Sequence, residues 1–141
     1  MTPRQTRLVQ QTFAAIVPIA DRAAELFYER LFELDPSLRA TFRGDLAEQR
    51  GKLIQMLAVV VRGLDDPDTL LPAVRALGAR HLGYGVRDAD YDAVGSALLW
   101  TLAQGLGDAF RPEVRVAWAT VYGLLARTML GGAAEARTAA A

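Results

Sequence analysis

The sequence predicts a single all-α domain, and two features carry this expectation. Apolar residues recur at spacings of three, four and seven along most of the 141 residues, as they do on one face of an α-helix. No segment alternates apolar and polar residues over the length of a strand, and no Asn-Gly or Asp-Gly pair links two β-branched runs as in a hairpin. A chain of this size, with 52% hydrophobic residues, can bury a core that also encloses a small cofactor.

The N-terminal part predicts two helices separated by a proline. Thr2 and Gln5 can form a capping box around Pro3, so a first helix is expected from Pro3 to about Val17. Pro18 then breaks or restarts the helix, because a proline inside a helix removes a backbone hydrogen bond and clashes with the preceding turn. The second helix should end at residue 34, ahead of the Asp35-Pro36 pair.

Four further helices are expected after residue 45. The third begins near Leu46 and stops before residues 65–67, and a shorter fourth helix carries His81 and ends near Gly83 and Gly85. The fifth spans about residues 90–106 and is closed by a glycine; the sixth begins at a proline, residue 112, and ends at glycines 131 and 132. We therefore expect a domain over residues 1–132 and a frayed, alanine-rich tail over 133–141.

Composition excludes several classes of function. The sixteen basic and sixteen acidic residues are interspersed, so no basic stripe indicates nucleic-acid binding. The longest apolar runs, such as residues 56–61, fall far short of the ~20 residues of a membrane span, and no signal-peptide pattern opens the chain. The lack of cysteine removes disulfides, thiolate metal sites and iron–sulfur clusters. A cytoplasmic location fits these features.

Three polar residues lie on apolar helix faces, where an unsatisfied polar group costs about 1–3 kcal/mol. They are Tyr28, Gln49 and His81, the only histidine in the chain. Each also has a purely structural interpretation: a core tyrosine or histidine with a backbone partner, or a glutamine at the edge of the protein.

Enzyme templates fit these residues poorly. A Ser-His-Asp arrangement would need Ser37 or Ser96, and Ser96 lies inside a helix without the sharp strand-to-helix turn of such a site. One histidine without cysteine does not make a zinc site. The remaining role for His81 is to offer one ring nitrogen to a metal that another ligand set already holds, and haem meets that requirement.

Three stretches resemble the bacterial single-domain globins related to the globin part of flavohaemoglobins. They are FYERLFELDPSLRATF at 27–42, EQRGKLIQML at 48–57 and LPAVRALGARHLGYGV at 71–86, and the likeness extends from about residue 5 to residue 129. The resemblance implies a globin fold and a bound haem b, iron protoporphyrin IX. It places Tyr91, Trp118 and Tyr122 where that group commonly has them.

The resemblance also assigns site residues. It makes His81 the iron ligand, Tyr28 and Gln49 the distal residues that donate hydrogen bonds to a bound gas, and Phe42 and Leu53 contacts of the porphyrin. The second nitrogen of His81 should donate to a carbonyl one turn back, near Leu77. Lys52, the only lysine, is expected either to pair with a haem propionate or to be a solvated side chain.

Two departures from the family pattern change what is expected. Because only seven positions separate Phe42 from Gln49, the short helix that many globins have there should be missing. The position of the family's proximal glutamate is Ala133, with Glu135 nearby but out of register, so peroxidase-like activity is in doubt.

The expected function is reversible binding of dioxygen, with nitric oxide dioxygenase activity that uses an external reductase, since 141 residues leave no room for a reductase domain. NO and CO are the other expected ligands. Storage or delivery of dioxygen, gas sensing, and a haem-free interaction role stay open as alternatives. Apolar residues on the last two helices could support a homodimer.

Overall fold

The computed structural model describes residues 1–42, 44–83 and 86–140, and these residues form six α-helices and no strand, as predicted. None of the helices in this part of the chain is long and apolar enough to cross a membrane. The helices are α1 (Pro3–Ile16), α2 (Ala20–Leu34), α3 (Leu46–Gly63), α4 (Pro67–Gly83), α5 (Asp90–Leu106) and α6 (Pro112–Ala140).

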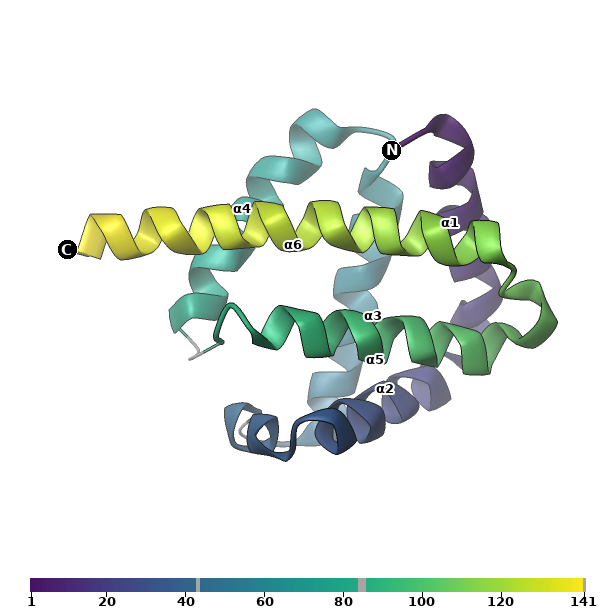
Figure 1. Ribbon diagram of the computed structural model, residues 1–141, viewed down its shortest axis with the longest axis horizontal. Coiled ribbons are helices and arrows are strands. Elements are labelled where there is room, and N and C mark those ends of the chain that lie inside the picture. Colours follow the sequence, from purple (N-terminus) through teal and green to yellow (C-terminus); the bar gives the residue numbers. More distant parts are fainter. Residues whose placement is uncertain (43, 84–85, 141) are drawn as a thin grey trace.

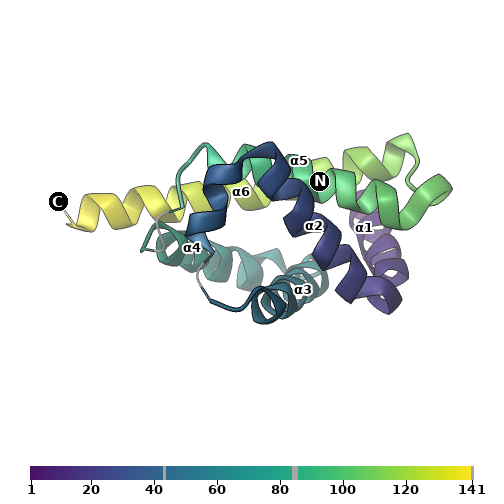
Figure 2. The same ribbon diagram turned by 90° about the horizontal axis from the view of Figure 1, so that it is seen from below.

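The helices are arranged in two crossing layers. Helices α5 and α6 lie antiparallel, and α1, α3 and α4 cross behind them at steep angles (Figure 1). Helix α2 packs against α5 and lies toward the viewer in the view from below (Figure 2). The most extensive contact between helices is that of α4 with α6, so the helix that carries His81 is held mainly by α6.

Most helix ends agree with the capping and proline signals. The backbone N–H of Thr2 donates to Oε1 of Gln5 at 2.9 Å, and that of Gln5 donates to Oγ1 of Thr2 at 3.1 Å, which confirms the capping box. A 3₁₀ turn at Val17–Ile19 separates α1 from α2 at Pro18. Helix α5 ends at Leu106, and the Gly107 that follows has a φ of 55°, a conformation that glycine adopts without steric cost.

The core is centred on Trp118, which is 2% exposed and joins α6 to α1. Its indole Nε1–H donates to Oγ1 of Thr12 at 2.8 Å, and the Thr12 hydroxyl in turn donates to the backbone oxygen of Leu8 at 2.6 Å. Both polar groups are therefore satisfied inside an apolar core, as buried polar groups must be to avoid a desolvation penalty.

The predicted end of the last helix is wrong. Helix α6 does not stop at Gly131 and Gly132 but continues to Ala140, with Ala133 only 3% exposed. A Cβ atom on Gly132 would collide with the backbone oxygen of Arg75, so this glycine permits a close helix crossing and is not a cap. Fraying of residues 133–140 in solution stays a prediction, and residue 141 lies outside the described residues, as does Gly85.

The same crossing predicts a large penalty for a side chain at Gly78. A Cβ atom there would overlap the backbone of Met129, which cannot rotate away as a side chain can. We expect Gly78→Ala to lower the free energy of unfolding by at least the ~1–3 kcal/mol typical of overpacking, measured by urea denaturation. Gly51→Ala is the control, because Gly51 is helical and exposed and a Cβ there would have no neighbour within 4 Å. This variant should raise the free energy of unfolding by up to ~1 kcal/mol, since alanine favours a helix more than glycine does. Equal stability of the two variants would contradict the close crossing.

Candidate functional site

The first part of the site is an aromatic cluster around Tyr28. Tyr28 lies on α2, is 5% exposed and contacts three phenylalanine rings. Its ring centroid is 5.0 Å from that of Phe27 and 5.3 Å from that of Phe42, both edge-to-face, and 6.0 Å from that of Phe32. Edge-to-face pairs are each worth about 0.5–1.5 kcal/mol beyond burial, so the ring is held in one orientation.

A tight corner brings Phe42 back to this cluster. Asp35 is extended ahead of Pro36, and its carboxylate accepts from the backbone N–H of Ser37 at 3.1 Å. The 3₁₀ segment that follows, Pro36–Thr41, returns the chain to α2, so that Phe42 packs on Tyr28 and Phe32. Among the described residues between Phe42 and α3 there is no helix, in agreement with the predicted loss of the short helix.

Gln49 lies in the first turn of α3, which Asp45 caps by accepting from the backbone N–H of Ala47 at 2.9 Å. The half-buried Gln49 side chain lies close to the Tyr28 hydroxyl. Burial raises the pKa of Tyr28, and the Gln49 side chain partly offsets that rise. Tyr28 is therefore a protonated phenol near pH 7, with an amide beside its hydroxyl.

His81 is half-buried on α4, and its ring orientation is set within the helix. Nδ1 lies 2.9 Å from the backbone oxygen of Leu77, which confirms the predicted partner one turn back. A carbonyl only accepts, so Nδ1 carries the proton and Nε2 is the basic nitrogen of the neutral ring. Burial, helped by the charge of Arg80, lowers the pKa of His81 despite the Leu77 bond, which favours the neutral ring that a metal ligand requires.

Leu53 and Lys52 have different surroundings, although they are neighbours on α3. Leu53 borders a small apolar cavity of about 20 Å³, room for about one water molecule, formed with side chains of α1, α2, α5 and α6. Lys52 is 64% exposed, and its Nζ lies 3.6 Å from Glu48 Oε1 on the same helix face. Its exposure and its contact with Glu48 support the interpretation of Lys52 as a solvated side chain. Pairing of Lys52 with a haem propionate stays a prediction.

Tyr91 lies in the first turn of α5, after the helix of His81. It is 9% exposed, and its backbone oxygen accepts from the Tyr122 hydroxyl at 2.6 Å, which joins α5 to α6. Burial raises the pKa of both phenols, so both are neutral donors near pH 7. Ala133 on α6 is buried, and the carboxylate of Glu135 is bound to Arg75 at 2.8 Å.

The structure thus brings Tyr28, Gln49 and Phe42 into one cluster and keeps Lys52 out of it. Sequence reasoning missed Phe27 and Phe32, which complete the enclosure of Tyr28. The helical spacing could have predicted Phe32, which follows Tyr28 by four residues on α2 and so lies on the same helix face.

The globin family model matches residues 25–129, a segment that contains Tyr28, Phe42, Gln49, Leu53, His81 and Tyr91. The chain belongs to the globin family. This globin is 35% identical over 136 residues to the flavohemoprotein of Chromobacterium violaceum and 33% identical over 135 residues to that of Deinococcus radiodurans. Each alignment covers 93% of this globin but 33% of the relative, so the chain spans about a third of the curated relatives that it matches.

A solved structure shares the fold over nearly the whole length of both chains. It is an engineered carbene transferase from Rhodothermus marinus whose name places it with nitric oxide dioxygenases; the TM-score is 0.86 at 25% identity, covering 99% of this globin and 97% of that chain. Family membership implies a haem cofactor and small gaseous ligands. The donor set fits haem: a neutral imidazole with one proton-free nitrogen on α4, and a phenol and an amide, both hydrogen-bond donors, on α2 and α3.

Proposed function

We propose that this globin binds haem b through Nε2 of His81, binds dioxygen reversibly, and converts nitric oxide to nitrate with electrons from an external donor. The observation that carries the proposal is the buried Tyr28 hydroxyl inside an aromatic enclosure, with the Gln49 amide beside it. A buried, protonated phenol is a strong hydrogen-bond donor for a partly negative ligand.

The haem, when bound, supplies the iron at which a diatomic gas is held and exchanges electrons. His81 presents Nε2 because its Nδ1 proton is committed to Leu77. Tyr28 directs its proton toward the ligand, while Gln49 fixes the orientation of the hydroxyl. The rings around Tyr28 exclude water, which would otherwise compete for its proton. Phe42 and Leu53 are proposed to contact the porphyrin on this side, and Tyr91 on the side of His81.

The reaction consumes one electron per turnover, since NO, O₂ and one electron together give nitrate. We therefore propose a separate reductase as partner and a cytoplasmic location, where reduced nicotinamide donors are produced. A homodimer through α5 and α6 stays a prediction; Val116 on α6, 55% exposed, is an apolar residue it could cover.

The test is the yield of nitrate from nitric oxide. The reduced, oxygenated protein is mixed with substoichiometric nitric oxide, and nitrate is measured by ion chromatography. We expect about one nitrate per nitric oxide consumed, and little nitrate from a sample first saturated with carbon monoxide. Stable oxygen binding without nitrate would support storage or delivery instead, and no saturable haem binding would overturn the proposal.

A further inference from the structure

The C-terminal turns of α6 contact the segment that carries His81 at three places. The backbones of Gly132 and Arg75 are in direct contact, because a Cβ on Gly132 would collide with the Arg75 oxygen. The Arg75 guanidinium lies over Gly131 and binds Glu135 Oε1 through Nε at 3.0 Å and through a terminal nitrogen at 2.8 Å. Arg137 binds Asp88 Oδ1 at 2.7 Å.

These two ion pairs lie on opposite sides of His81 along the chain. Arg75 precedes His81 by six residues, and Asp88 follows it by seven. The pairs hold residues 75 and 88 to positions 135 and 137, which lie about half a turn apart on α6. One short stretch of α6 therefore contacts the segments on both sides of the histidine.

We propose that residues 131–138 of α6, which we call the proximal clamp, position His81 for iron binding. This inference rests on the proposed function, in which His81 is the iron ligand. The clamp residues touch neither the cofactor nor the gas; they act on His81 through the placement of α4.

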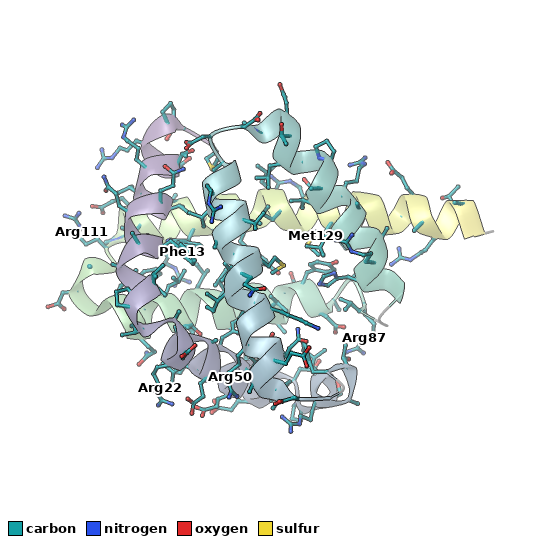
Figure 3. All side chains as sticks on the ribbon, turned by 180° about the vertical axis from the view of Figure 1, so that it is seen from behind. Phe13, Arg22, Arg50, Arg87, Arg111 and Met129 are labelled. Carbon is teal, nitrogen blue, oxygen red and sulfur yellow. The ribbon has the colours of Figure 1, made fainter. Side chains whose placement is uncertain are left out.

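The placement of α4 matters because the His81 ring is oriented by its own helix. Nδ1 is bonded to Leu77 on α4, so Nε2 moves wherever this helix moves. Close backbone contacts at Gly78 and Gly132 set the separation of α4 and α6, and Met129 lies at this crossing (Figure 3). Glycine contacts resist approach of the helices but not their separation or sliding. The Arg75–Glu135 ion pair, in which two guanidinium nitrogens bind one carboxylate oxygen, opposes both separation and sliding.

The resemblance to flavohaemoglobin-like globins suggests that the acid near the proximal histidine has a different role in this chain. The position where related globins have a glutamate is the buried Ala133, and the acid in this chain, Glu135, binds Arg75. The carboxylate thus acts on the helix that carries the histidine and not on the imidazole.

The competing explanation is that the two ion pairs are surface contacts with no effect on His81. All four of their side chains are about half exposed, from 47% to 63%. Such pairs often contribute little to stability. A readout of the iron–histidine bond separates the two explanations, because a surface ion pair with no positioning role would leave that bond unchanged.

The test compares two double variants, each of which replaces one acidic and one basic residue. One pair of substitutions lies near the C-terminal end of α6, and the other lies at its N-terminal end. Glu135→Gln/Arg137→Gln disrupts both ion pairs of the clamp, and Arg111→Gln/Glu113→Gln removes the exposed pair, 3.4 Å apart, at the other end of the same helix. The full chain is loaded with haem, and the iron–histidine stretching band of the ferrous form is recorded by resonance Raman spectroscopy. Transfer of haem to an excess of a haem-binding acceptor is timed in parallel.

We expect the clamp variant to shift or broaden the iron–histidine band and to lose haem about three- to tenfold faster, with no change in the control. Screening predicts that 0.5 M salt moves the unaltered chain toward the clamp variant. An unchanged band and haem-loss rate in the clamp variant would overturn this inference alone. Absence of the band from the unaltered, haem-loaded chain would overturn the proposed function and the inference with it.

Discussion

Replacing His81 with glycine should abolish the iron–histidine bond and weaken haem binding by roughly a hundredfold or more, since loss of a ligand exceeds the 10–100-fold cost of losing a ligand's supporting partner. The chain contains no other histidine or cysteine that could take its place. The affinity is measured by absorption titration with ferric haem, followed by reduction and addition of carbon monoxide. Added imidazole should restore the spectrum of a histidine-ligated protein, because it fills the space that the ring vacates.

Lys52→Ala is the matched control for this experiment. Lys52 is an exposed residue of α3 paired with Glu48, and its truncation should change haem affinity by less than about threefold, the effect of a weak surface pair. A glycine variant that binds haem as tightly as the unaltered chain, with the same carbonmonoxy spectrum, would remove His81 from the site. A large loss in Lys52→Ala would instead support the propionate contact.

Replacing Tyr28 with phenylalanine should raise the dissociation rate of oxygen roughly ten- to hundredfold, because a hydrogen bond to a charged group is worth about 1.5–3 kcal/mol. The substitution keeps the ring, so the contacts with Phe27 and Phe42 should survive and the fold should not change. The rate is measured by stopped-flow displacement of oxygen by carbon monoxide. An unchanged rate would exclude the hydroxyl as a donor to the ligand.

The proximity of Gln49 to Tyr28 also predicts how the two residues combine. Gln49→Leu removes the amide beside the Tyr28 hydroxyl and should raise the oxygen dissociation rate less than Tyr28→Phe does, because the hydroxyl keeps its proton. The double variant should be only slightly faster than Tyr28→Phe, with a coupling of about 0.5–3 kcal/mol. Additive effects would show that each residue acts on the ligand independently.

The helices and the residues of the proposed site were predictable where their signals are local. The capping box at Thr2 and Gln5, the break at Pro18 and the stop at Gly107 depend on a few neighbouring residues, and the structure confirms all three. The bond from His81 to Leu77 belongs to this class, since residues four apart meet on one helix face.

The distal contacts needed the assembled fold. Tyr28 and Gln49 are 21 residues apart on different helices, so sequence reasoning could assign each a role toward the ligand but not their proximity to one another. That proximity depends on the packing of α2 against α3, which are separated by the corner at Asp35 and the helix start capped by Asp45. The exposure of Lys52, which the sequence left open, was decided in the same way.

The sequence by itself determined the all-α fold and the family resemblance, and it singled out the proposed iron-binding histidine and distal residues, because these depend on residue type and spacing along one helix. Only the tertiary structure decided the end of α6 and the role of its glycines. Two glycines that follow a helical pattern of apolar residues look the same in the sequence whether they end the helix or allow two helices to pack closely. The contact of Gly132 with Arg75 selects the second alternative, and with it the clamp on the helix that carries His81.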